Sequence, residues 1–133
     1  MSSTATLGYV IHYVQDVNKT LLFYKNAFGF EIRFMSPDED YGELITGSTT
    51  LAFAQHQLAA SNLNQAYVAT NIQSPPPGIE IGVVCQDVES FVQRAVENGA
   101  TLETATKTKP WGQVVAYVRD PDGLLVEICS PME

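Results

Sequence analysis

The sequence has few cysteines, little positive charge and no long apolar run. Its two cysteines, Cys85 and Cys129, lie in apolar, strand-like stretches, which is typical of reduced core thiols rather than a disulfide framework. Seven basic residues against fifteen acidic ones disfavour a nucleic-acid partner, because phosphate binding needs concentrated positive charge. No apolar run approaches the ~20 residues of a membrane span, and the first residues lack the pattern of a signal peptide. We therefore expect a cytoplasmic protein with no membrane partner.

What the chain does contain is enough apolar material for one globular domain. Hydrophobic residues make up 45% of 133 residues, a length typical of a single domain. The net charge of −8 favours solubility, and it would also suit a cationic ligand.

A short motif recurs along the chain. Val14-Gln15-Asp16-Val17 is repeated 71 positions later as Cys85-Gln86-Asp87-Val88, and Tyr41-Gly42 is echoed by Trp111-Gly112 at a displacement of 70. Two matches in the same order at nearly one displacement indicate a duplicated unit. We place the first copy at about residues 7–56, a linker at about 57–78 and the second copy at about 79–131. A linker of this length is typical of a connecting segment or a functional flap.

Each copy predicts one strand, one helix and three further strands. Asp16 and Asp87 stand at helix N-cap positions, and Gly29 and Gly99 stand where the apolar helical spacing ends. The predicted strands are about 7–14, 30–35, 42–46 and 50–55 in the first copy and about 79–85, 101–104, 113–118 and 124–129 in the second. The fold class is therefore α+β, built from two βαβββ modules.

Residues 9–30, which contain Gln15-Asp16-Val17, resemble the opening of a vicinal oxygen chelate module. Residues 111–128, which contain Trp111-Gly112-Gln113 and Val126-Glu127-Ile128, resemble its closing hairpin. This superfamily includes glyoxalase I, bleomycin resistance proteins and extradiol dioxygenases. The resemblance implies curled mixed sheets whose concave side holds a metal or ligand, in a cup that a homodimer completes. Open sheet edges give a physical reason for such pairing.

The resemblance also implies one metal-ligand position on the first and last strand of each module. In the second module these positions hold Glu80 and Glu127. In the first module the displacement of 71 gives Tyr9, a poor ligand when neutral, and the last position falls at Phe53 or Ala54. No usual ligand stands there, although a slip or bulge could present the neighbouring Gln55 or His56.

The candidate carboxylates have an alternative interpretation as solvated residues at strand ends. Against it, Glu127 lies in the apolar run 124–129, where an unpaired carboxylate is costly, so we expect a partner such as Glu80. His12 lies three residues after Tyr9, and strand alternation then places the two side chains on opposite faces. We therefore expect His12 in the core rather than in a two-histidine iron site.

Several aromatic side chains could form the wall of an apolar cup, although aromatic residues on strands are more often plain core. Trp111 follows Pro110 at the entrance of a strand, where it can lean over a cavity mouth. The predicted ligand-binding residues are Tyr9, Tyr13, Phe53, Gln55, Trp111 and Tyr117.

Two functions remain open, and both involve a small-molecule ligand and a homodimer. The first is a glyoxalase-like lyase or isomerase that uses a divalent metal (Mg, Mn, Ni or Zn) held by Glu80 and Glu127, with Glu127 as the catalytic residue. The alternative is a non-enzymatic, metal-free protein that sequesters a drug, as the bleomycin resistance proteins do. The incomplete ligand set is the weakness of the first function and suits the second.

Overall fold

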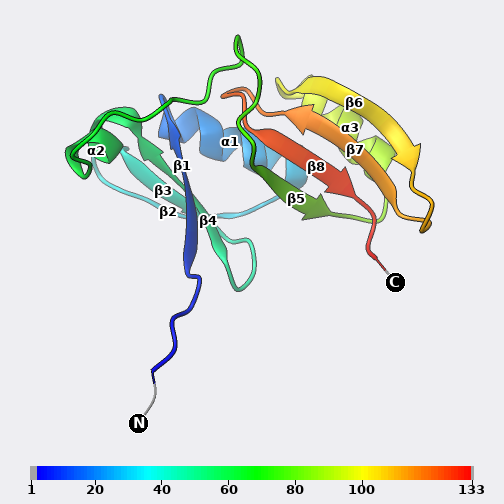
Figure 1. Cartoon of the computed structure of the whole chain (residues 1–133), viewed down its shortest axis with the longest axis horizontal. Helices are drawn as coiled ribbons and strands as arrows, with labels where there is room; N and C mark the ends of the chain where they lie inside the picture. The colour runs from blue at the N-terminus through cyan, green and yellow to red at the C-terminus, as the bar shows by residue number, and fades with distance from the viewer. Residues whose placement is uncertain (1–2, 133) are drawn as a thin grey trace.

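The computed structural model describes residues 3–132 and consists of two four-stranded sheets with helices (Figure 1). The first module contains β1 (Tyr9–Val14), α1 (Val17–Phe28), β2 (Ile32–Met35), β3 (Tyr41–Leu44) and β4 (Thr50–Gln55), with strand order β1-β4-β3-β2. The second contains β5 (Glu80–Val84), α3 (Val88–Glu97), β6 (Thr101–Thr108), β7 (Val114–Arg119) and β8 (Leu125–Cys129), with order β5-β8-β7-β6. The predicted α+β fold of two βαβββ modules is confirmed.

Both sheets are mixed. The first and last strands of each module, β1 with β4 and β5 with β8, pair in parallel, and the other pairs are antiparallel. The predicted helix starts are also confirmed, since Asp16 accepts a hydrogen bond from the Lys19 amide and Asp87 from the Ser90 amide, both at 3.1 Å.

One core joins the two modules. Tyr24 of α1 stacks on Phe53 of β4, and Phe28 of α1 stacks on Phe91 of α3, so the helices pack against each other as well as against the sheets. Burial of Phe28 and of Phe53 contributes about 1.5–3 kcal/mol each. The helices therefore cover one face of each sheet and leave the other face free. Within residues 3–132, no helix is long and apolar enough to cross a membrane.

A buried carboxylate fastens the second module to α1. The Tyr24 hydroxyl donates to Asp120 at 2.6 Å, and the other Asp120 oxygen accepts from the amides of Asp122 and Leu124. Asp120 has no exposed surface, and this burial raises the pKa of its carboxyl to about 6. The Asp120-Pro121-Asp122-Gly123 turn thus serves the junction of the modules as well as the β7–β8 hairpin.

The segment between the modules is tied to the body of the protein. It begins with a short helix, α2 (His56–Ser61). No helix was predicted in this segment. The buried Arg119 guanidinium donates to the carbonyls of Asn71, Ile72 and Gly123. A Cβ atom at Gly123 would lie 2.8 Å from the backbone of this segment, so the position needs glycine.

Candidate functional site

The free face of each sheet carries the side chains that alternate with the core residues. In β1, Val10 and Val14 face the core, so Tyr9 and Tyr13 belong to the free face. In β5, Ile81 and Val83 face the core, so Glu80 belongs to the free face. Tyr9 and Glu80 therefore occupy matching places, in keeping with the displacement of 71.

The strand register identifies the partner positions. Glu127 lies two residues beyond the residue paired with Glu80, on the adjacent parallel strand. The residue two positions beyond the partner of Tyr9 is Ala52. Ala52 is therefore the structural counterpart of Glu127, and the first module carries no usual metal ligand at its two counterpart positions, Tyr9 and Ala52.

The expectation that Phe53 or Ala54 matches Glu127 is wrong for a local reason. The β6–β7 hairpin is longer than the β2–β3 hairpin, because β6 has 8 residues and β2 has 4. Because of this difference, the sequence displacement between equivalent residues is larger for the last strands of the modules than for the first strands. A count that starts from the first strands therefore misses the true counterpart.

The second sequence echo is also not a structural equivalence. Gly42 lies inside β3, where a Cβ atom would come within 2.6 Å of the Leu21 side chain of α1. Gly112 lies in the β6–β7 turn with a φ of 92°. The two glycines are thus required for different reasons, close packing in one case and turn geometry in the other.

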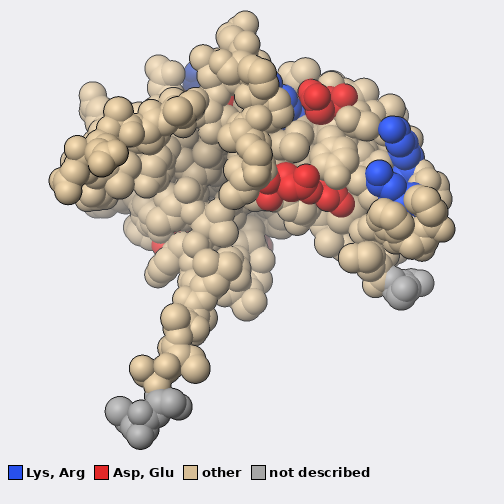
Figure 2. Space-filling view, viewed as in Figure 1, with Lys and Arg blue, Asp and Glu red and all other residues tan. Residues whose placement is uncertain are grey.

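Glu80 and Glu127 lie together on the free face of the second sheet, and Figure 2 shows acidic side chains side by side over β5 and β8. A hydrogen bond between the two carboxyl groups, burial and the charge of Glu127 raise the pKa of Glu80 to about 7. No basic side chain among residues 3–132 lies within ion-pair distance of either carboxyl. Glu80 therefore keeps its proton into the neutral pH range, and a cation held by both carboxyls would take the place of that proton.

Two further side chains surround this carboxyl pair. The Tyr117 hydroxyl lies 3.4 Å from Glu127 on the neighbouring strand, and burial followed by the charge of Glu127 raises the pKa of Tyr117. Burial and the same charge raise the pKa of the Cys129 thiol to about 11. Cys129 therefore remains a thiol at neutral pH and is not a thiolate nucleophile.

Two of the predicted ligand-binding residues do not face the cup. Phe53 is fully buried on the helix side, because strand alternation places it opposite to Ala52 and Ala54. Gln55 also lies on the helix side, at the end of β4. Both assignments are corrected.

The other aromatic residues are accessible. Tyr13 lies against Tyr67 of the inter-module segment, with ring centroids 5.0 Å apart. Trp111 is 64% exposed in the β6–β7 turn, and its indole N–H donates to Gln113 at 2.9 Å. Tyr9 is 57% exposed. These side chains remain available to a ligand or a partner surface.

His12 lies on the helix side, as alternation predicts. Its ring packs edge-on against Phe53, and its Nε2 lies 3.0 Å from the Thr70 hydroxyl. Burial lowers the pKa of His12, so the imidazole is neutral. Within residues 3–132 no group of three or more His, Cys, Asp or Glu side chains is placed to hold a metal. One chain thus offers a cation two carboxylates, which fits a weakly held hard ion but not a four-ligand site.

A polar group on the free face of the first sheet was not predicted from the sequence. The Tyr41 hydroxyl donates to Glu43 at 2.8 Å, and the Arg33 Nε lies 3.7 Å from the other Glu43 oxygen. Glu43 pairs with Ala52 across β3 and β4, as Tyr117 pairs with Glu127 across β7 and β8. The alternation of Glu43 with the core residues Gly42 and Leu44 was the signal that could have found it.

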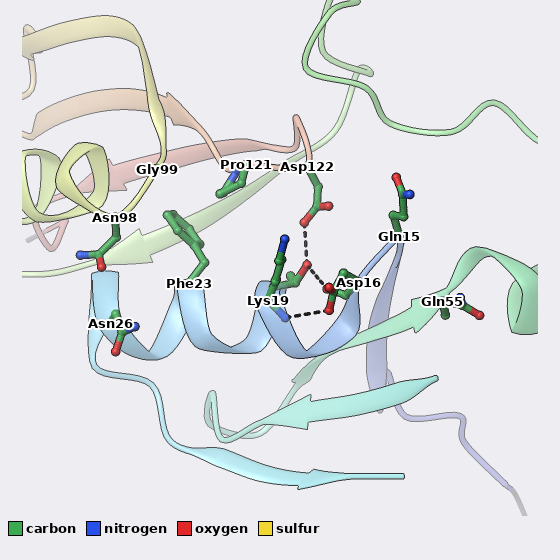
Figure 3. Close-up of a pocket in the computed structure, with 11 residues that line it drawn as sticks. Gln15, Asp16, Lys19, Phe23, Asn26, Gln55, Asn98, Gly99, Pro121 and Asp122 are labelled. Atoms are coloured by element: carbon green, nitrogen blue, oxygen red, sulfur yellow. Dashed lines mark hydrogen bonds between the residues drawn. The ribbon is translucent and has the colours of Figure 1, made fainter. Parts of the chain in front are cut away.

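A cleft lies on the helix side, at the start of α1 and beside the β7–β8 turn (Figure 3). It encloses about 810 Å³, and the Thr20 hydroxyl donates to Asp122 across it at 2.7 Å. Its wall consists mostly of polar side chains around the ring of Phe23. This cleft is separate from the carboxyl pair, because neither Glu80 nor Glu127 lines it.

Comparison with known proteins agrees with this architecture. Residues 7–133 match the model of the glyoxalase-like domain family. The chain is similar to a glyoxalase-related enzyme from Fulvimarina pelagi, with 20% identity, a TM-score of 0.81 and coverage of 96% of this chain and 89% of that one. It is also similar to a glyoxalase/bleomycin resistance protein/dioxygenase family enzyme from Burkholderia phytofirmans PsJN, with 21% identity, a TM-score of 0.75 and coverage of 95% and 98%.

A curated relative is the uncharacterised protein YraH of Bacillus subtilis (strain 168), 24% identical over 116 residues, which are 86% of this chain and 90% of that protein. The match to the family model spans nearly the whole chain. The chain therefore belongs to the glyoxalase-like domain family and, with it, to the vicinal oxygen chelate superfamily.

Proposed function

We propose that this protein binds a small oxygenated molecule on the free face of its second sheet and transfers a proton on it with the Glu80–Glu127 pair. The observation that supports this proposal is the pair itself, two carboxyl groups from adjacent parallel strands with no basic partner among the described residues. Perturbed carboxyl groups of this kind are enriched at functional sites.

The two carboxyls suit opposite roles in a lyase or isomerase reaction. Glu127, whose carboxyl lies 3.4 Å from the Tyr117 hydroxyl, is the base that removes a proton from the carbon beside a ligand carbonyl. Glu80, with a pKa of about 7, is the acid that returns a proton to the resulting enolate. The proton balance closes once Glu127 passes its proton back to Glu80 through their hydrogen bond.

A divalent metal fits the same place, where Glu80 and Glu127 would hold it together with water. When bound, such an ion supplies Lewis-acid stabilisation of negative charge on a ligand oxygen. Glu127 keeps the role of base in either case. The metal would take the place of the proton that the two carboxyls share.

A second copy of the chain completes the cup in this proposal. β1 and β5 are sheet edges, and exposed apolar side chains such as Ile11 and Val84 lie on their free faces. Unpaired edges and exposed apolar surface favour association with another module. Sedimentation equilibrium at micromolar concentration tests this step, and a clean monomer would contradict the shared cup.

The central experiment is a calorimetric titration with Mg²⁺, Mn²⁺, Ni²⁺ and Zn²⁺ on the wild type and on Glu127→Gln. The substitution should weaken metal binding at least tenfold, because an amide is a poorer ligand and carries no charge. Glu97→Gln, which changes an exposed carboxylate on α3, is the matched control. Equal affinity of all three proteins for every ion would remove Glu127 from the site.

The second candidate is a metal-free protein that sequesters a drug. The observation in its favour is the absence of usual ligands at Tyr9 and Ala52. Titration with a cationic glycopeptide of the bleomycin type separates the two functions. Tight binding of the glycopeptide by a protein that binds no metal would favour sequestration over catalysis.

A further inference from the structure

The free face of the first sheet holds a compact set of aromatic and charged side chains. Across the strands, Phe34 of β2 is paired with Glu43 of β3, which is paired with Ala52 of β4. Tyr41 occupies the next position of this face on β3, and its ring lies 6.0 Å from that of Phe34. Two aromatic rings therefore flank one carboxylate.

Glu43 is held in place by its neighbours. Its side chain is only 12% exposed, and the Tyr41 hydroxyl donates to one of its oxygens at 2.8 Å. Burial and this hydrogen bond raise the pKa of Tyr41 well above its usual value. Tyr41 is therefore a stable phenol donor that leaves the other oxygen of Glu43 for a cationic partner.

Arg33 occupies that second oxygen only loosely. Its Nε lies 3.7 Å from Glu43 and its side chain is 46% exposed. An ion pair of this length and exposure contributes little stability. The contact therefore does not by itself explain a carboxylate kept at 12% exposure among aromatic rings.

We propose that Phe34, Tyr41 and Glu43 form a binding site for the alkylammonium group of a small molecule, from which Arg33 is displaced on binding. Aromatic faces attract a cation through their quadrupoles, and a desolvated carboxylate adds direct charge attraction. A guanidinium ligand fits less well, because Tyr41 already takes one Glu43 oxygen and blocks bidentate contact. The site lies on the other sheet from Glu80 and Glu127 and does not depend on their chemistry.

The experiment compares choline with its uncharged isostere 3,3-dimethylbutan-1-ol in NMR titrations of the full-length protein. Choline should shift the ring signals of Phe34 and Tyr41 in a saturable way, and the alcohol should bind at least tenfold more weakly. Glu43→Gln should weaken choline binding about tenfold or more. Arg33→Gln should strengthen it several-fold, because the competing cation is removed. Glu97→Gln makes the same change of net charge on α3 and should leave binding unchanged.

Several results would overturn the inference. They are equal affinity for choline and the alcohol, no saturable binding of choline, or unchanged affinity in Glu43→Gln. Loss of choline binding in Glu127→Gln but not in Glu43→Gln would move the cation to the second sheet, and it would leave the proposed function standing. If Glu43→Gln does not give a dispersed spectrum, Phe34→Leu replaces it, with several-fold weakening expected and unchanged affinity counting against the site.

Discussion

The two sheets have the same strand order but place their polar groups differently. Each free face carries one tyrosine hydroxyl directed at one glutamate, Tyr41 to Glu43 within β3 and Tyr117 to Glu127 between β7 and β8. In the first sheet the carboxylate stands at the place that Tyr117 occupies in the second, and Ala52 stands at the place of Glu127. Both modules thus contain a tyrosine next to a glutamate, but the glutamate lies on β3 in the first module and on β8 in the second.

The two free faces also differ in the charged groups that surround their carboxylates. Glu43 has a cationic neighbour, Arg33, whereas Glu80 and Glu127 have no basic side chain within ion-pair distance among the described residues. We therefore expect the second face, rather than the first, to take up a proton or a metal cation. The free face of the first sheet has its carboxylate partly balanced by Arg33, and it carries the two neighbouring rings of Phe34 and Tyr41.

The largest expected effect comes from making the two sheets alike. Ala52→Glu places a carboxylate at the counterpart of Glu127, where the native side chain has no exposed surface. Overpacking and an unpaired buried charge should lower the free energy of unfolding by about 3 kcal/mol. Chemical denaturation measures this change.

The reverse substitution is the control for that comparison. Glu127→Ala removes a half-buried carboxylate and its repulsion with Glu80, so it should change stability by less than about 1 kcal/mol. If Ala52→Glu were as stable as the wild type, the first sheet would have room for a ligand carboxylate. The description of Ala52 as a fully covered position would then be wrong.

The next effect concerns the two β-turns before the last strands. The Thr46 hydroxyl accepts the Leu51 amide in the first turn, and the buried Asp120 carboxyl accepts the Leu124 amide in the second. Because folding raises the pKa of Asp120 from 3.8 to about 6, its stabilisation is full below about pH 3.8 and is lost as the pH rises through about 6. Between these two pH values the free energy of unfolding of Asp120→Asn should therefore change by about 2 kcal/mol less than that of the wild type.

Thr46→Ala separates the two kinds of turn. It should cost about 1 kcal/mol at every pH, because it removes a neutral hydrogen bond and no titrating group. Thermal melts of both variants between pH 4 and pH 7 make the comparison. Because Glu80 adds its own slope in this range, the slope should be reduced rather than abolished in Asp120→Asn, and a slope as steep as that of the wild type would show that Asp120 does not contribute.

These turns and strands also show what the sequence can reveal. Asp16 and Asp87 identified both helix starts, and the order of elements followed from strand alternation and helical spacing because those signals are local. The counterpart of Glu127 could not be found in this way, because it depends on a hairpin length that no local pattern encodes. The same limit hid Glu43, whose importance depends on being paired with Ala52 across the sheet.

A smaller effect tests the charge difference between the faces. The pKa of Glu80 is about 7 against a usual 4.5, so the stabilisation from its protonated form is full below about pH 4.5 and is lost as the pH rises through about 7. Glu127→Gln removes the neighbouring charge and should bring the pKa of Glu80 down towards its usual value. NMR titration of the side-chain carboxyl carbons measures it, and a value near 7 in the variant would attribute the shift to burial instead.

The last comparison concerns the two tyrosine hydroxyls, whose removal should differ in cost by only about 1 kcal/mol. Tyr41→Phe removes a 2.8 Å hydrogen bond to a nearly buried carboxylate, so it should cost about 1–2 kcal/mol of stability. Tyr117→Phe removes a contact of 3.4 Å, beyond the usual length of a hydroxyl hydrogen bond, so it should cost no more than about 0.5 kcal/mol. Denaturant unfolding of both variants gives the difference. An equal cost would mean that Tyr117 holds Glu127 as firmly as Tyr41 holds Glu43, and the second face would then be as fixed in geometry as the first rather than free to close on a ligand.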